Sequence, residues 1–399
     1  MNRKQSEIKF VGLHAHSVAG SIFDAVGYPQ VHMDFAYENG CDALALTDHG
    51  NMNGLAYQVL HARKMREEGK EFKPIFGCEA YFLPSLTEWR EEYTKAMEDK
   101  KRARSIKKAG QSGATVEDEN DSKKVQDLLR RRRHLILIAQ NQTGLNNLFK
   151  LISESYQPEN YYRYPRMDYD LLEKYNEGII AASACLGGVY AGNYWENREE
   201  GPEAVLSAMR ETTSQMVKIF GDRWYAELQW NNIPEQHELN QHIITVAKEF
   251  GVGLISTADS HYPNPDAWKD RELYKRLGWL GKGAPAWANG NELPDGVDEI
   301  GYELYPKNGD QMWESYKKYS AEYEYDDQLV LDSIQETYNI AHERIDTFFP
   351  DNTVRLPSFV VPAGFTDTQA LINLSLEGLR EKGLHEQQAY MDRLDRELH

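Results

Sequence analysis

Residues 8–16 have the sequence Ile-Lys-Phe-Val-Gly-Leu-His-Ala-His, in which apolar residues lead to two histidines two positions apart. Alternate side chains of an extended strand lie on the same face, so His14 and His16 would project together from a strand end. Such a pair of imidazoles can chelate zinc, manganese or iron. The alternative is a chance His-x-His pair in a chain with 12 histidines. The remaining potential ligands of the chain decide between these interpretations.

Six further segments have the pattern of short buried strands, and most are separated by amphipathic stretches of helical length. With residues 8–16 as the first strand, the others are predicted over 43–47, 74–82, 135–139, 178–186, 224–228 and 254–258, and helices over 29–39, 53–68, 143–155, 202–220 and 234–250. This alternation is typical of a parallel sheet, so we predict an α/β fold, a TIM-like βα barrel with seven strands. In such barrels the chemistry collects where the strands end.

Three regions depart from this alternation. Residues 86–133 are dense in charged side chains and predict a solvated insertion, with a helix near 87–108 and a second helix that ends in the arginines 130–133. A basic flap that steers a polyanion toward the site is the functional alternative. We predict a barrel domain over 1–265 and a loop-rich and helical extension over 266–350 with a helix over 326–346. Residues 351–399 are predicted to be a linker and helices, with one helix over 367–382 and the start of another after 387.

The composition limits the possible functions. The chain has 399 residues, of which 41% are hydrophobic and 27% charged, as in ordinary globular proteins. Its net charge of −18 argues against a general nucleic-acid coat, because phosphate binding favours a basic surface. The charge does not exclude a nuclease, since metal ions supply positive charge locally. Three scattered cysteines, a polar N-terminus and the lack of an apolar run of about 20 residues predict a cytoplasmic protein without a membrane partner.

Further potential metal ligands follow the predicted strands. His49 lies in Thr47-Asp48-His49-Gly50 and would either project into the barrel mouth or belong to a capping turn. Asp259 and His261 repeat, after the last strand, the alternate-position geometry of the first histidine pair. Glu79 lies among apolar neighbours, where a carboxylate is costly to bury unless it is paired or bound to a metal. Together these residues indicate a metal site more strongly than any of them alone.

Three more donors carry weaker signals. Cys185 ends the fifth predicted strand and is either a ligand or a small buried hydrophobe. His134 opens its apolar run instead of closing it, so by itself it indicates a surface residue at a strand start. Asp24 is a loop carboxylate, for which helix capping is the default interpretation.

The motifs taken together resemble the PHP (polymerase and histidinol phosphatase) domain, and more narrowly the N-terminal PHP region of the family C polymerases, the bacterial DNA polymerase III α subunits. The resemblance rests on His14-Ala15-His16-Ser17, Thr47-Asp48-His49-Gly50-Asn51, Gly77-Cys78-Glu79-Ala80-Tyr81, His134-Leu135, Ser183-Ala184-Cys185-Leu186-Gly187 and Asp259-Ser260-His261-Tyr262, and it extends to 162–168, 303–307 and 389–398. This family implies a distorted seven-stranded βα barrel that holds three divalent metal ions.

The resemblance also implies a set of ligands. Carried over position by position, one metal would bind to His14, His16, Glu79 and Asp259, a second to Glu79, His134 and Cys185, and a third to Asp24, His49 and His261. The metals would be zinc, manganese or iron, and catalysis would rest on His14, His16, Glu79, Asp259 and His261. Asp24 departs from the family pattern, because its spacing from His16 is one residue longer than usual and Ala25 replaces a common glycine.

The function that the resemblance implies is that of a metal-dependent phosphoesterase, specifically a 3′–5′ exonuclease that proofreads a primer end within a DNA polymerase. Arg166 and Tyr162 are predicted to bind single-stranded DNA or the primer end by holding a phosphate or stacking on a base, with ordinary packing as the alternative for the tyrosine. A downstream palm region or a split-gene partner chain would polymerise DNA, with residues 367–399 as a docking or continuation segment. A stand-alone phosphatase and a structural metal-binding module that stabilises a polymerase are the two alternatives.

Overall fold

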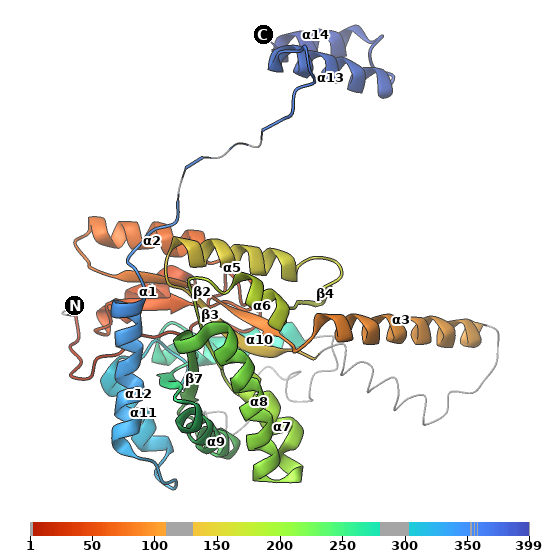
Figure 1. Ribbon diagram of the computed structural model, residues 1–399. Coiled ribbons are helices and arrows are strands. Elements are labelled where there is room, and N and C mark those ends of the chain that lie inside the picture. Colours follow the sequence, from red (N-terminus) through yellow and green to blue (C-terminus); the bar gives the residue numbers. More distant parts are fainter. Residues whose placement is uncertain are drawn as a thin grey trace. The chain divides into compact units, whose positions relative to one another are not determined.

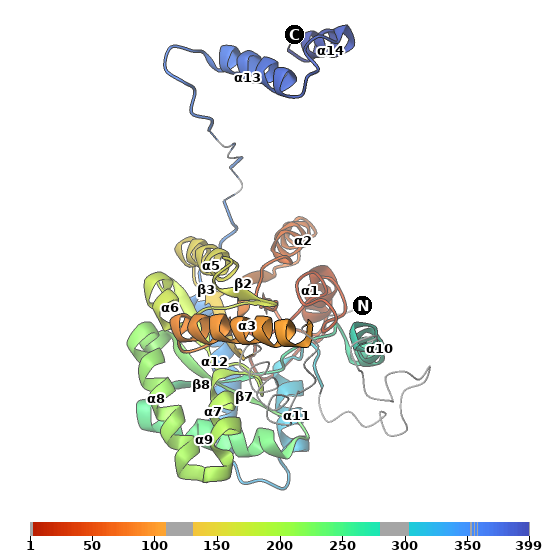
Figure 2. The same ribbon diagram turned by 90° about the vertical axis from the view of Figure 1, so that its right-hand side faces the viewer.

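The computed structural model describes residues 3–108, 131–279 and 303–398, except for residues 352, 355 and 357. Residues 1–350 form one compact unit, and residues 351–399 form a second. In the first unit, helices surround a strongly curled β-sheet (Figures 1 and 2). The coarse prediction of an α/β fold is thereby confirmed.

Within the described residues, the main sheet contains six strands in the order β1-β2-β3-β6-β7-β8. Their bounds are Ala43–Leu46 for β1, Lys73–Phe82 for β2, Arg133–Ala139 for β3, Ile179–Ala182 for β6, Trp224–Gln229 for β7 and Gly253–Thr257 for β8. A separate pair, β4 (Tyr161–Tyr162) and β5 (Tyr164–Pro165), forms a small hairpin. The prediction of a seven-stranded barrel was therefore too regular.

The segment predicted as the first strand explains the difference in strand number. Residues 8–16 join the sheet only through isolated bridges, between Gly12 and Leu44 on one side and between Ala15 and Ser260 on the other. The backbone amide of Thr47 donates to the carbonyl of Ala15 at 2.8 Å, and that of His16 donates to the carbonyl of Ser260 at 2.7 Å. This segment therefore contacts β1 and the turn after β8 without forming a continuous ladder.

The direction of β3 also differs from the prediction of a parallel sheet. β3 is antiparallel to both β2 and β6, whereas β1 is parallel to β2, and β6, β7 and β8 are parallel to one another. His134, near the start of β3, is paired with Tyr81, near the end of β2. An antiparallel strand begins at the edge where its neighbours end, so His134 lies at the same mouth as the ligands that follow other strands.

The helices mostly agree with the periodicity of the sequence. Their bounds are Pro29–Glu38 (α1), Leu55–Glu67 (α2), Leu86–Lys108 (α3), Gln142–Ser155 (α5), Tyr169–Tyr175 (α6), Val189–Asn197 (α7), Pro202–Phe220 (α8), Pro234–Phe250 (α9), Trp268–Trp279 (α10), Gly309–Tyr319 (α11), Asp327–Asn339 (α12), Asp367–Glu381 (α13) and Gln388–Leu398 (α14). Short 3-10 turns occupy Arg198–Glu200, Gly221–Arg223 and Pro265–Ala267. The predicted helix over 326–346 ends early as α12 and continues as one π-helical turn, Ile340–Arg344.

The charged insertion is described only at its two ends. α3 starts with the buried side chains of Leu86 and Trp89 and then extends away from the sheet (Figure 1). The predicted turn and most of the predicted second helix lie outside the described residues. Where the chain is described again, Arg133 already belongs to β3, so the predicted helix end at 131–133 was wrong.

The sheet is buried on both faces, which agrees with the apolar runs of its strands. One face packs under α5, α7, α8 and α9, and the inner face forms a second cluster with the π-helical turn. The inner cluster consists of Val11, Leu13, Ala43, Ala45, Ile75, Ile136, Ile138, Ile180, Ala182, Ala184, Tyr225, Ile255, Ile340, Ala341 and Ile345. Lys73 fixes the turn to the sheet, because its ammonium donates to the carbonyl of Ala341 at 2.6 Å. Residues of the predicted extension therefore complete the core of the first unit.

The second unit contains α13 and α14. A capping box at Thr366 and Gln369 starts α13, and Gly383 follows its end with a φ of 65°. Among the described helices, none combines the length and the apolar character required to cross a membrane.

Candidate metal centre

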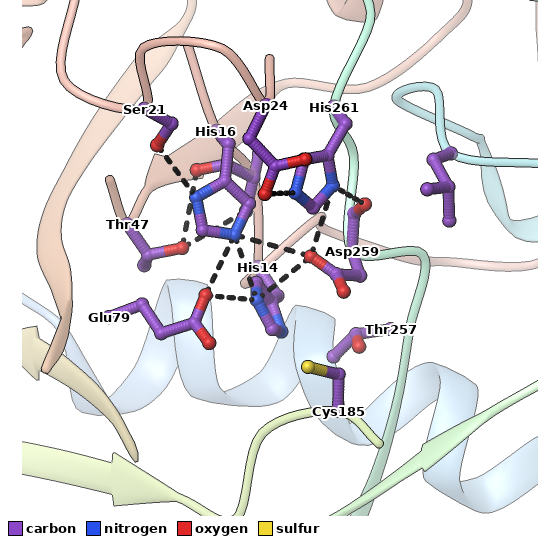
Figure 3. Close-up of polar contacts among 12 residues, drawn as sticks. His14, His16, Ser21, Asp24, Thr47, Glu79, Cys185, Thr257, Asp259 and His261 are labelled. Atoms are coloured by element: carbon purple, nitrogen blue, oxygen red, sulfur yellow. Dashed lines mark hydrogen bonds and ion pairs between the residues drawn. The ribbon is translucent and has the colours of Figure 1, made fainter. Parts of the chain in front are cut away.

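Four of the predicted ligands converge at the mouth of the curled sheet (Figure 3). The Nε2 atoms of His14 and His16 are 3.1 Å apart. Oε2 of Glu79 lies 3.2 Å from the first and 2.9 Å from the second of these nitrogens. Oδ1 of Asp259 lies 3.0 and 3.2 Å from the same two atoms. The four residues form one group in which every pair of ligand atoms lies within 4.8 Å.

These separations fit a bound cation. Tetrahedral zinc with bonds of about 2.0–2.1 Å places its ligand atoms about 3.3 Å apart, close to the values found here. Two imidazole nitrogens and two carboxylates are also the donor types that zinc, manganese and iron accept. Oε1 of Glu79 and Oδ1 of Asp259 are buried and form no hydrogen bond within the described part of the chain, although histidine nitrogens lie near both. The residues present therefore fit a divalent cation.

Backbone conformation brings the ligands after β6 and β8 into the mouth. Asp259 follows β8 with a φ of 48°, and Ala184 follows β6 with a φ of 61°. Non-glycine residues rarely adopt this left-handed conformation, which is common where structure is constrained at functional sites. The turn after β6 changes the direction of the chain just before Cys185. The turn after β8 does so at Asp259 itself.

A second group of donors shares Glu79 with the first. It consists of His49, Glu79 and His134, and Nδ1 of His134 forms a close ion pair with Oε1 of Glu79. Nδ1 of His49 lies 3.2 Å from Oε2 of the same carboxylate. Cys185 lies outside this group, with its Sγ atom 3.7 Å from Nδ1 of His134. Glu79 is thus the carboxylate between two groups of histidines.

A third group consists of His16, His49 and His261. Asp24 lies beside it, with Oδ2 3.0 Å from Nε2 of His49 and 3.4 Å from Nε2 of His261. The guanidinium of Arg271 donates to Oδ1 of Asp24 at 2.6 Å and to its backbone carbonyl at 2.6 Å. Asp24 therefore turns one oxygen toward the histidines and the other toward the arginine. The structure brings all nine predicted ligands to the mouth, seven of them within the three groups.

Residues behind the histidines hold their second ring nitrogens. Nδ1 of His16 lies 3.1 Å from Oγ of Ser21, which donates to Oδ1 of Asp48 at 2.9 Å. Nδ1 of His14 lies 2.7 Å from Oε1 of Glu227 on β7. The sequence analysis did not select Glu227, although it is a carboxylate inside an apolar strand and so carries the same signal as Glu79.

The electrostatics of the site follow from this crowding. Burial opposes protonation of His49, but the Glu79 and Asp24 carboxylates outweigh it and raise the pKa of His49 to about 10. Burial and the nearby Arg271 guanidinium lower the pKa of His261 to about 4. Burial and the Asp259 carboxylate raise the pKa of the Cys185 thiol well above its usual value.

The side chains differ in exposure, and this indicates where the site opens. The side chains of His14, His16 and Glu79 are 0% exposed and form the floor. The side chain of Asp24 is 37% exposed and that of His134 is 19% exposed. A substrate would therefore approach over the Asp24 and His134 sides.

The two predicted substrate-binding residues lie in different surroundings. Arg166 is 0% exposed, and its guanidinium donates to the carbonyls of Tyr162 and Tyr164, each at 2.9 Å. It also packs over the ring of Trp89. This geometry gives Arg166 a structural role and does not support its predicted contact with a phosphate. Tyr162 is partly buried, and its ring packs against that of Tyr93.

The chain is similar to several known proteins. The PHP domain family matches residues 12–231. The chain is 34% identical over 396 residues to the DNA polymerase III subunit alpha of Aquifex aeolicus, and 31% identical over 378 residues to that of Borreliella burgdorferi. These matches cover 98% and 93% of this chain but only 29% and 27% of the relatives, so the chain spans less than a third of their length. A solved amidohydrolase from Chromobacterium violaceum is similar at 16% identity, with a TM-score of 0.32 over 66% of this chain and 96% of that one.

Proposed function

Because this chain belongs to the PHP domain family, we propose that it is a metal-dependent phosphoesterase whose substrate is the 3′ end of a DNA strand. The observation that carries the proposal is the convergence of His14, His16, Glu79 and Asp259 at distances that suit one divalent cation. The histidine groups on the other side of Glu79 provide donors for further cations, up to the three that the family resemblance implies.

In this proposal the chain's own residues bind the cations and orient the phosphate ester. His14, His16, Glu79 and Asp259 would hold one cation, Glu79, His134 and Cys185 a second, and Asp24, His49 and His261 a third. Divalent cations bound there would activate water and stabilise the charge that develops on phosphate oxygens. Asp24 and His134, at the exposed rim, would contact the incoming ester, and the buried floor would exclude bulk water.

The finer assignment to a 3′–5′ exonuclease rests on the similarity to DNA polymerase III α subunits over nearly the whole chain. A proofreading module would act beside a polymerase palm, supplied by a downstream region or by a partner chain. The relatives' greater length supports a role within a larger polymerase. The partners of the metal centre would then be a primer 3′ end and the palm that extends it.

The test uses purified protein, freed of metal with a chelator and then supplied with Zn²⁺ or Mn²⁺. Each sample is incubated with 3′-labelled single-stranded DNA and, separately, with p-nitrophenyl phosphate. Asp259→Asn removes one charge from the cluster, and Asp332→Asn, on the exposed side of α12, is the matched control. We expect nucleotide release that requires metal, is lost in Asp259→Asn and is unchanged in Asp332→Asn.

The other outcomes separate the alternatives. Turnover of p-nitrophenyl phosphate alone would favour a phosphatase for small esters. Metal binding without turnover of either substrate would favour a structural module. Nucleotide release that persists in Asp259→Asn would contradict the assignment of the reaction to this site.

A further inference from the structure

Glu227 lies directly behind the metal centre, on the strand β7. It is 1% exposed, and its Oε1 atom is 2.7 Å from Nδ1 of His14. The opposite ring nitrogen of His14, Nε2, is one of the four atoms that converge with Glu79 and Asp259. His14 therefore lies between a buried carboxylate and the predicted cation site.

The hydrogen bonds around Glu227 fix its Oε1 atom as an acceptor. Its Oε1 atom accepts a hydrogen bond from the Thr257 hydroxyl and another from the Gln229 amide at 3.0 Å. An oxygen that already accepts from two donors carries no proton of its own to donate to His14. The contact with His14 is then a donation from Nδ1–H to Oε1.

The direction of this hydrogen bond decides what Nε2 can do. A neutral imidazole carries one proton, so a proton on Nδ1 leaves a lone pair on Nε2. Only the nitrogen with the lone pair can bind a metal ion, and a carboxylate behind the ring increases its basicity. The other tautomer would point an N–H into the cluster and block the site.

Resting on the proposed function, we propose that Glu227 is a positioning residue that holds His14 with its proton on Nδ1, and thereby sets the affinity of the site at His14, His16, Glu79 and Asp259 for a divalent cation. Among the residues that the structure describes, no carboxylate contacts Nδ1 of His16, which faces the Ser21 hydroxyl instead. His14 is therefore the ligand whose orientation depends most on one charged side chain.

The experiment measures metal binding by the full chain, with Zn²⁺ as the probe. Glu227→Gln keeps the size of the side chain and replaces its carboxyl group with an amide, and Glu322→Gln, at an exposed position, is the control. We expect Glu227→Gln to weaken Zn²⁺ binding about ten- to a hundred-fold, in the range of losses seen when the partner of a ligating histidine is changed. The control variant should bind as the parent does.

Two further measurements separate positioning from a general loss of stability. Two-bond ¹H–¹⁵N spectra of histidine-labelled, Zn²⁺-loaded protein should show a proton on Nδ1 of His14 and none on its Nε2 atom in the parent, and a loss of this single arrangement in Glu227→Gln. The rise in Tm on adding Zn²⁺ should shrink in the variant, whereas a purely structural role would lower the Tm with and without Zn²⁺ equally. If Glu227→Gln does not fold, Thr257→Val, which removes one donor to Oε1, should show the same changes to a smaller extent.

The outcomes that overturn the inference are distinct from those that overturn the function. Zn²⁺ binding of parental strength in Glu227→Gln, or a His14 whose Nδ1 atom carries no proton in the Zn²⁺-loaded parent, would overturn the role of Glu227 alone. A parent chain that binds no divalent cation would overturn both this inference and the proposed function.

Discussion

Glu79 is the residue that two of the three groups of donors share. One of its oxygens faces the Nε2 atoms of His14 and His16, and the other faces His134. A buried carboxylate without partners would destabilise the fold by several kcal/mol, so its presence at 0% exposure requires the histidines or a cation. Its removal should therefore affect more than one metal.

We expect Glu79→Gln to lower the number of metal ions bound per chain by more than one. The reason is that its carboxylate belongs to two groups of donors. Cys185→Ser, at the edge of one group, should lower the number by one at most. Elemental analysis of dialysed protein measures both values, and equal losses in the two variants would contradict a shared carboxylate.

The pH dependence of metal binding follows from His49. Its pKa is raised from 6.5 to about 10, so at neutral pH the metal-free protein holds a proton there that a cation must displace. The ion pair of His49 with Glu79 stabilises the metal-free fold fully below pH 6.5 and is lost as the pH rises through about 10. Apparent metal affinity should therefore rise between these limits, about ten-fold per pH unit for each displaced proton.

Isothermal titration calorimetry at pH 7 and pH 8 tests this dependence. Two buffers with different ionisation enthalpies at each pH give the number of protons released per cation. His61→Ala, which removes a histidine outside the cluster, should release the same number as the parent. Binding that releases no protons would show that His49 is already neutral.

At the scale of elements, the loop between β6 and α7 holds Cys185 near His134. Gly188, the N-cap of α7, closes this loop, since its backbone amide donates to the carbonyl of Cys185 at 2.7 Å. A Cβ atom at Gly188 would overlap the carbonyl oxygen of Ser183. The loop can therefore accept a side chain at this position only by opening.

We expect Gly188→Ala to lower the free energy of unfolding by about 1–3 kcal/mol, the usual cost of an overpacked site. It should also weaken metal binding to the group that contains His134. Urea denaturation and metal analysis measure the two effects. Gly378→Ala, where a Cβ meets nothing within 4 Å, should leave both unchanged or stabilise α13 slightly. Similar results for the two variants would mean that the loop is not tightly closed.

The elements also show what the sequence could predict. Most helices begin and end close to the predicted residues, because their apolar periodicity and capping residues are local signals. The direction of β3 is not local, since a short apolar run such as 135–139 looks the same in either direction. His134 therefore looked misplaced until the antiparallel pairing with β2 brought it to the mouth.

The site shows the same division between local and distant signals. Nine potential ligands could be selected from residue type, strand position and family resemblance. The burial of Arg166 could not be predicted, because an arginine among tyrosines has the same local pattern whether it faces solvent or the core. Glu227 could have been found by the rule that selected Glu79, a carboxylate within an apolar strand.

At the scale of the whole first unit, the donors connect distant parts of the chain. His14 follows the segment that bridges to β1, Glu79 lies in β2, and Asp259 follows β8. A cation held by these residues would join β2 to the turn after β8, near the two ends of the sheet order, which the bridges of residues 12–16 and the π-helical turn also link. Metal binding should therefore stabilise the unit as a whole and not a single loop.

Removal of metal tests this coupling. We expect a chelator to lower the free energy of unfolding, because a ligand that binds only the folded state at 100 times its Kd contributes about 2.7 kcal/mol. Calorimetry should show the main unfolding transition moving to lower temperature with EDTA and returning with Zn²⁺. Glu79→Gln should show a much smaller metal-dependent shift, since it lacks the carboxylate between the groups. The contrary outcome is an unfolding temperature that EDTA does not change, together with faster hydrogen exchange only near Asp259. It would mean that the metals order the mouth of the sheet but do not stabilise the whole unit.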